Sequence, residues 1–228
     1  GLPPVWVGWC SDPPPPPTAL PPGATVAPRA RGASTTLVVP VASGRLWAWG
    51  TVPPDGSRRT GSWETVTEAL SRQQVHAAFG TPGSGVAGFR GSHREAERGE
   101  RFEGLRREAG RMPRRATAYA DVAAVALLAA DLDAAGDFVR RELGALCARS
   151  GPMEALRTTL YHYIGAERSL VDVARRLHVA RGTVTYRVKR AQEVLGHDLD
   201  DRRFSLHTAL ALAEELGDAV LVPRDAER

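Results

Sequence analysis

The sequence predicts an α+β domain followed by an all-α helical bundle. Up to about residue 148, short β-branched and aromatic runs alternate with helical patterns, whereas only helical patterns follow Pro152. The stretch from Ser169 to Gly196 also reads as two short amphipathic helices joined by a tight turn. We therefore expect a proline-rich linker or disordered tail at residues 1–34, the α+β domain at 35–148, a helix-turn-helix domain at 152–217 and a flexible tail at 218–228.

The first stretch is rich in proline, and Pro13–Pro17 are consecutive. Proline lacks a backbone N–H and fixes φ, so such a run favours polyproline II and forms neither a helix nor a central strand. The run suits either a ligand for a proline-binding domain or a plain linker. We favour the linker.

The α+β domain is expected to begin with a hairpin. Residues 37–41 and 45–50 read as two strands around a turn at Gly44. Pro40 indicates an edge strand, because proline cannot donate to a strand ladder. The further expected elements are a helix at 62–74, a strand at 75–80, a loop at 81–85, a strand at 86–89, a helix opened by a capping box at 92–95, a strand at 116–119 and a helix at 122–130. This order predicts an antiparallel sheet backed by helices.

Helical patterns dominate the second half of the chain. A helix at 131–148 is expected to join the two halves. Pro152 suits the first turn of the next helix, which runs to about Ile164. A final helix at 202–216 closes the bundle or binds a second copy with one apolar face, formed by Leu206, Leu210, Ala213 and Leu216.

Local signals define both helices of the expected helix-turn-helix. Ser169 can cap the first helix, and His178 falls where a left-handed turn residue is needed. Gly196 is placed to end the second helix. The buried face of that second helix is Val184, Val188, Ala191 and Leu195.

The opposite face of the second helix is basic and polar, which suits a DNA major groove. A solvated charged face is the alternative interpretation. We expect four side chains near the start of the helix to read base edges: Arg181, Thr183, Thr185 and Tyr186. Three more are expected at phosphates: Arg187, Lys189 and Arg190. Gly182 completes the candidate DNA-binding set.

The stretch also resembles a known family. Met153–Leu216 includes LYHYIGAERSLVDVARRLHVARGTVTYRVKRAQEVLG, which is similar to the C-terminal helix-turn-helix of the PucR/CdaR family of bacterial transcriptional regulators. Its ArgGlyThr at 181–183 resembles the start of the recognition helix in Fis-type helix-turn-helix domains. The PucR/CdaR family commonly has His/Arg-Asn-Thr at this place. VHAAFGTPGSGVAGFRGSHREAERGERF resembles the GGDEF-like domain that precedes it in that family. The resemblance implies a degenerate GGDEF-like antiparallel sheet with helices, followed by the helix-turn-helix bundle.

The expected function is therefore sequence-specific regulation of transcription. The expected partner is double-stranded DNA, bound as a homodimer because one recognition helix covers only a few base pairs. An unidentified small-molecule effector is a further expected partner, and the GGDEF-like domain is a candidate for sensing or dimerisation. The alternative is a degenerate nucleotide-binding or cyclase-like protein whose helical tail serves protein contacts.

We do not expect an enzyme. A cyclase needs carboxylates to hold metal ions against a triphosphate, and the loop at 81–85 carries no acid. His76 and His93 lack the converging ligands of a metal site and are interpreted as structural. We expect no catalytic residue, cofactor or metal.

Composition bounds the compartment. Net charge is +4, which permits nucleic-acid binding. Cys10 and Cys147 are far apart and form no disulfide framework, so a reducing cytoplasm is expected. No apolar run approaches the roughly 20 residues that span a bilayer, so no membrane partner is expected.

Overall fold

The structure, a computed structural model, describes residues 4–11, 36–41, 45–51, 67, 68, 70, 71 and 75–223. The chain divides into two units. The first extends to Arg107 and includes Met112–Ala126, and the second contains Glu108–Arg111 and the chain from Leu127 onward. The sequence places this boundary at 148–152 instead. The helix that follows Asp131 thus belongs with the helix-turn-helix and not with the sheet.

A five-stranded sheet with the order β2-β3-β1-β4-β5 forms the first unit. Its strands are β1 (Pro4–Ser11), β2 (Thr36–Val41), β3 (Arg45–Thr51), β4 (Val75–Phe79) and β5 (Ala116–Ala118). The pairs among β2, β3, β1 and β4 are antiparallel, as predicted, whereas β5 runs parallel to β4. The hairpin β2–β3 and the edge position of Pro40 are confirmed.

The prediction of a linker or disordered tail at 1–34 is wrong for Pro4–Ser11. These residues form the central strand β1, which pairs with β3 at Trp6↔Trp49 and with β4 at Cys10↔His76. The physical reason is that β-branched and aromatic residues follow Pro4, and a proline at the first position of a strand is tolerated. The run Pro13–Pro17 lies outside the described residues.

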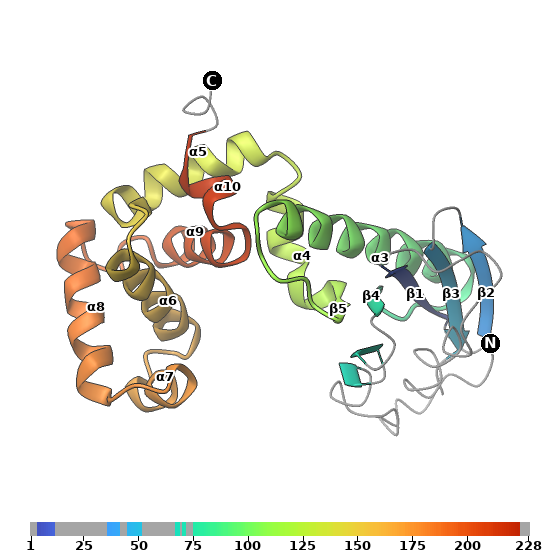
Figure 1. Cartoon of the computed structure of the whole chain (residues 1–228), viewed down its shortest axis with the longest axis horizontal. Helices are drawn as coiled ribbons and strands as arrows, with labels where there is room; N and C mark the ends of the chain where they lie inside the picture. Colours follow the sequence, from blue (N-terminus) through green and yellow to red (C-terminus); the bar gives the residue numbers. More distant parts are fainter. Residues whose placement is uncertain are drawn as a thin grey trace. The chain divides into compact units, whose positions relative to one another are not determined.

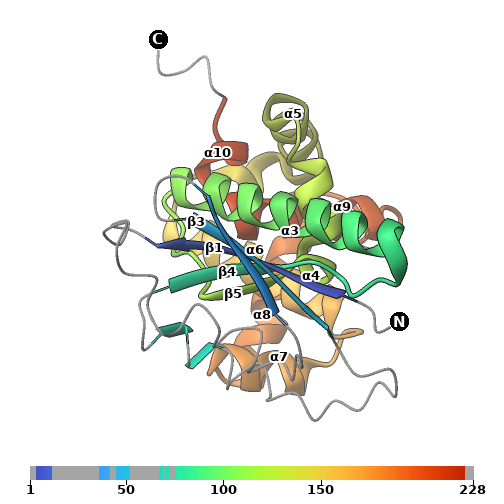
Figure 2. The same cartoon turned by 90° about the vertical axis from the view of Figure 1, so that its right-hand side faces the viewer.

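Helix α3 (Gly85–Glu108) packs on the sheet of the first unit (Figure 2). The predicted strand at 86–89 and capping box at 92–95 are wrong, because both lie inside this helix. The helical spacing brings Phe89 and His93 onto the same face, where both rings stack on Trp49 of β3 at 5.2 and 5.6 Å. Strand geometry would turn alternate residues away from the sheet. Glu95 accepts a hydrogen bond from the Thr81 backbone N–H at 2.7 Å and so anchors the preceding loop.

Figure 1 shows the helices that follow the sheet. They are α4 (Tyr119–Leu128), α5 (Leu132–Leu143), the 3-10 turn η2 (Gly144–Cys147), α6 (Gly151–Gly165), α7 (Leu170–Leu177), α8 (Arg181–Leu195), α9 (Arg203–Leu216) and α10 (Asp218–Leu221). The predicted helix 131–148 ends early, because Gly144 adopts a φ of 49°. Ser150 caps α6, and Pro152 lies in its first turn as predicted. Of the predicted helix 62–74, only residues 67, 68, 70 and 71 are described, and they are helical.

The core of the second unit lies between α5, α6, α9 and α10. The predicted apolar face of α9 is confirmed, since all four of its residues are buried. The flexible tail predicted at 218–228 is wrong for Asp218–Leu221, which form α10. Val220 is fully buried, and Arg140 of α5 donates hydrogen bonds to the carbonyls of Val220 and Val222 at 3.2 and 3.3 Å. In the described part of the chain, every helix is too short or too polar to cross a membrane.

Candidate nucleic-acid interface

Helix α7 begins at a side-chain cap. The Ser169 hydroxyl accepts a hydrogen bond from the Asp172 backbone N–H at 3.2 Å and donates one to the Asp172 carboxylate at 2.5 Å. This cap was predicted, and it fixes where the helix starts. Val173 is fully buried one residue later, so the start of α7 is also its anchor to the bundle.

The turn between α7 and α8 depends on a left-handed residue. His178 has φ 53° and ψ 43°, as its position in the sequence predicted. The Val179 N–H then donates to the carbonyl of Ala174 at 3.0 Å, which closes the end of α7. Histidine tolerates this conformation better than most residues with a Cβ. The turn therefore sets the crossing of the two helices.

Helix α8 buries one face and exposes the other. Val184 and Ala191 are completely buried, and Val188 and Leu195 are partly buried. Gly196 ends the helix with φ 75°, and its N–H donates to the carbonyl of Gln192 at 3.0 Å. The predicted buried face and C-terminal glycine are both confirmed.

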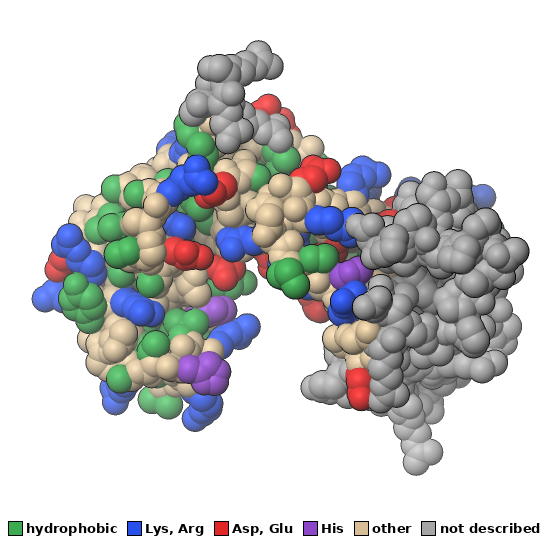
Figure 3. Space-filling model, viewed as in Figure 1, with side chains coloured by type: hydrophobic (Ala, Val, Ile, Leu, Met, Phe, Trp, Pro, Cys, Tyr) green, Lys and Arg blue, Asp and Glu red, His purple; other side chains and the backbone are tan. Residues whose placement is uncertain are grey.

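The eight predicted DNA-binding residues lie on this helix, in its first ten positions. Most are exposed: Arg181, Gly182, Thr185, Tyr186, Lys189 and Arg190. Thr183 and Arg187 are half-buried. Figure 3 shows Lys and Arg side chains along the edge of the second unit where α7 and α8 lie. The helix thus presents a basic and polar surface opposite its apolar face.

The three predicted phosphate-contacting cations differ in their surroundings. Arg187 donates to the hydroxyl of Thr159 on α6 at 3.4 Å, and Arg190 pairs with Glu193 at 2.8 Å. Glu193 raises the pKa of Arg190, first through this hydrogen bond and second through its negative charge. Lys189 makes no hydrogen bond or ion pair with any residue that the structure describes. Its charge is therefore fully available to a ligand.

Gly182 lies at the start of α8 without a structural need for glycine. Its φ is not in the left-handed region, and a Cβ built there would have no neighbour within 4 Å. Ala180, the residue before α8, has no side chain that caps the helix. No side chain therefore caps the start of α8, and the space beside Gly182 is open.

Sequence reasoning missed a second pair of arginines. Arg175 and Arg176 are exposed on α7, the helix that precedes α8. Arg175 pairs with Asp172 at 3.3 Å. The signal that could have revealed them is their place in the last turn of an amphipathic helix.

His76 and His93, which the sequence predicts to be structural, both contact neighbouring side chains or backbone in the first unit. His76 contacts the carbonyl of Arg114 at 2.8 Å with Nδ1 and the Arg115 guanidinium at 3.1 Å with Nε2. His93 packs between Trp47 and Trp49. Across the described segments there is no cluster of three or more His, Cys, Asp or Glu that could hold a metal ion.

The glycine-rich loop before α3 packs on that helix. A Cβ at Gly83 would lie 2.6 Å from the Cα of Gly88, and the Thr81 N–H is already bonded to Glu95. These glycines therefore allow the loop to approach the helix backbone closely. A phosphate cradle would instead need backbone N–H groups that point outward.

Two family models match the chain in this order. Residues 5–102 match the GGDEF-like domain, and residues 156–213 match the PucR C-terminal helix-turn-helix domain. The chain belongs to the PucR-type regulators. This family assignment makes the chain a DNA-binding transcriptional regulator, and it includes β1 in the GGDEF-like domain.

A solved structure also resembles this chain. A regulator of polyketide synthase expression from Bifidobacterium adolescentis is 24% identical, with 94% of this chain and 81% of that chain covered and a TM-score of 0.38. A TM-score this low carries no argument about the present chain. The search of curated proteins found no significant match to this chain.

Proposed function

We propose that the chain binds double-stranded DNA sequence-specifically, with α8 in the major groove. One observation carries the proposal. Helix α8 buries Val184 and Ala191 completely, while the residues at its start face solvent with arginine, threonine and tyrosine side chains. A recognition helix needs this division, because its N-terminal side chains reach base edges while its back is held by the domain.

The residues of α8 divide into two proposed groups. Arg181, Thr183, Thr185 and Tyr186 read base edges, because they lie in the first six positions of the helix. Lys189 and Arg190 contact phosphates. Gly182 lets the helix backbone approach the DNA closely, since the fold itself leaves its Cβ position empty. Arg187 holds the helix against α6 as well as adding charge.

We propose a homodimer as the active species. Helix α8 has 15 residues and is therefore about 22 Å long, of which only the first turns reach the bases. One such helix reads only a few base pairs, so two copies are needed for a specific site. Half-sites about 34 Å apart, or a multiple of that, fit two-fold symmetry. A DNA-binding role agrees with the cytoplasmic location that the sequence predicts.

The alternative function is nucleotide binding by the GGDEF-like domain, without catalysis or with it. The packing of the loop at 81–84 on α3 disfavours that function. A regulator without catalysis is the proposal that remains.

The test is a selection of bound fragments from a random double-stranded DNA library, with the purified full chain at two salt concentrations. An enriched motif with two half-sites is expected, and it should persist at the higher salt. Binding without any enriched motif, lost as salt rises, would reduce α8 to an electrostatic patch. Tight nucleotide binding together with no DNA affinity would favour the alternative.

A further inference from the structure

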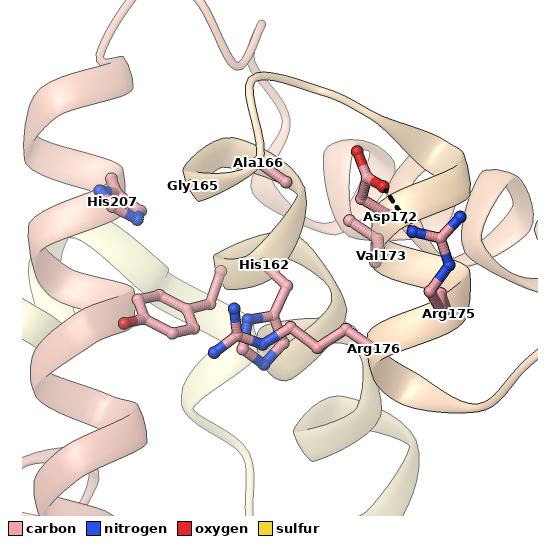
Figure 4. Close-up of a pocket in the computed structure, with 9 residues that line it drawn as sticks. His162, Gly165, Ala166, Asp172, Val173, Arg175, Arg176 and His207 are labelled. Atoms are coloured by element: carbon pink, nitrogen blue, oxygen red, sulfur yellow. Dashed lines mark hydrogen bonds and ion pairs between the residues drawn. The ribbon is translucent and has the colours of Figure 1, made fainter. Parts of the chain in front are cut away.

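A cavity of about 530 Å³ lies in the second unit. Figure 4 shows that residues of α6, α7 and α9 line it. None of the described residues of α8 is among them. The volume falls within the range of small-molecule sites, about 300–1,000 Å³. The cavity is therefore a site separate from the proposed DNA surface.

Arg176 supplies an uncompensated positive charge to the cavity. Figure 4 shows its guanidinium reaching from α7 to His162 of α6. It makes no ion pair or side-chain hydrogen bond with any part of the chain that the structure describes. Arg175, one residue earlier, is instead paired with Asp172 at 3.3 Å. The lining thus has one free cation beside one neutralised pair.

Aromatic rings form another part of the wall. Tyr161 stacks on His207 with centroids 5.4 Å apart and an interplanar angle of 16°. His162 lies 5.0 Å from Tyr161. A Cβ at Gly165 would lie 3.3 Å from Nε2 of His207, so the glycine leaves room for the imidazole. The wall therefore offers flat apolar surface together with ring nitrogens.

The surroundings of both imidazoles favour the neutral ring, because they lower the pKa of each. Burial lowers the pKa of His162, and the positive charge of Arg176 lowers it further against a smaller opposing effect of Glu214. Burial also lowers the pKa of His207, as does Arg203. The charge of the lining is then set by two arginines and one aspartate, a balance of one positive charge. A monoanion fits this balance better than a polyanion, whose second negative charge would have no free cation of the lining to pair with.

We propose that this cavity binds a small planar aromatic carboxylate. The carboxylate pairs with Arg176, whose fork of N–H groups matches it, and the ring lies beside Tyr161 and His207. The ring of His162, near Arg176, accepts a hydrogen bond from a polar group on the ligand or donates one to it. The ligand class follows from the one free guanidinium and the aromatic wall.

The site is also placed to affect DNA binding, a part of the inference that rests on the proposed function. The ligand contacts α6 and α7, and α6 holds α8 through Thr159 and Arg187. A ligand that binds this arrangement of the three helices stabilises it. DNA affinity should therefore rise when the cavity is occupied.

The first test uses benzoate as the probe and the full chain without DNA. The ring-proton NMR signals of His162 and His207, assigned with His→Gln variants, are followed during a benzoate titration. We expect saturable shifts of both signals. Benzamide, which is planar but neutral, and cyclohexanecarboxylate, which is anionic but not planar, should each bind about tenfold more weakly.

Two charge-matched variants separate this site from general attraction of anions. Arg176→Gln should raise the Kd for benzoate about tenfold, whereas Arg175→Gln, on the same helix, should change it less than about threefold. Equal effects of the two variants, or no saturable shift, would overturn the proposal. Because DNA is absent, this result is independent of the proposed function. A separate DNA titration with and without benzoate then tests the coupling.

Discussion

The guanidinium of Arg187 on α8 lies 3.4 Å from the hydroxyl of Thr159, a fully buried residue of α6. The Thr159 hydroxyl in turn donates to the Ala155 carbonyl at 2.6 Å. One of the predicted phosphate-contacting arginines thus also ties α8 to the helix behind it. Arg187 therefore contributes both to the stability of the bundle and to the orientation of the proposed DNA-binding surface.

Replacement of Arg187 by glutamine is expected to destabilise the second unit. Loss of a partly buried hydrogen bond should lower the free energy of unfolding by about 1 kcal/mol. Lys189→Gln removes the same charge from an exposed position and should leave it unchanged. Denaturant unfolding followed by far-ultraviolet circular dichroism compares the two. If the variants unfold alike, the contact with Thr159 contributes nothing to stability.

Arg181→Ala is expected to reduce specific DNA binding selectively. Removal of a base-reading arginine should cost about 1–3 kcal/mol at the selected motif and relax its sequence at one position. Lys189→Ala should instead weaken all sequences alike and lower the salt dependence. Titrations of both variants with specific and scrambled duplexes measure the difference. Equal losses of Arg181→Ala on the two duplexes would assign that side chain to the phosphates.

Gly182→Ala separates the needs of the fold from those of DNA. The Cβ meets open space and the backbone is helical, so the free energy of unfolding should stay the same or rise by up to about 0.5–1 kcal/mol. DNA affinity should fall by about 1–3 kcal/mol because the backbone can no longer approach closely.

Gly151→Ala is the matched control for that variant, since Gly151 also begins a helix with an empty Cβ position. It should leave DNA affinity unchanged. Undiminished DNA binding by Gly182→Ala would show that the start of α8 does not approach the duplex closely.

Glu103→Gln is expected to destabilise the GGDEF-like unit. The buried carboxylate accepts hydrogen bonds from Arg106 at 3.0 Å, from the Arg114 side chain and backbone at 3.2 Å, and from the Thr117 hydroxyl at 2.9 Å. Loss of its charge should cost about 2–4 kcal/mol, because the guanidinium of Arg106 is itself largely buried. Since all five tryptophans precede residue 64, tryptophan fluorescence reports the unfolding of this unit alone. The more exposed Glu97→Gln is the control, and an equal midpoint for both variants would contradict the expected role of Glu103.

The second unit should lose stability as the pH falls. The pKa values of His162 and His207 are lowered in the folded state, by burial first and by Arg176 and Arg203 respectively next, while Glu214 opposes the shift at His162. The unfolded chain therefore takes up protons first. The loss begins as the pH falls through the ordinary histidine pKa and ends below the lowered pKa values. His162→Gln with His207→Gln should flatten this slope, which denaturant unfolding at a series of pH values measures; an unchanged slope would contradict the role of these two rings.

The helix-turn-helix was predictable because its signals are local. The cap at Ser169, the left-handed His178 and the terminal Gly196 each act on backbone within a few residues, and the structure has all three. The division of α8 into buried and exposed faces follows from helical period alone.

The remaining features depend on residues far apart in the sequence. Strand β1 pairs with β3 and β4, and a neighbouring proline run hides it. The sequence at the start of α3 predicts a strand. The structure has a helix there, whose Phe89 and His93 stack on Trp49 of a distant strand. Arg176 and His207 line the same cavity although they are 31 residues apart, and no local sequence pattern predicts this.

The short helix α10 decides where a functional truncation must stop. Val220 and Leu221 are buried, and Arg140 donates hydrogen bonds to the carbonyls of Val220 and Val222. A fragment cut after Gly217 would lose both apolar side chains, each worth about 2 kcal/mol, and would expose the part of α5 that packs on α10. A shortened protein for DNA or ligand studies should therefore retain residues up to at least 222.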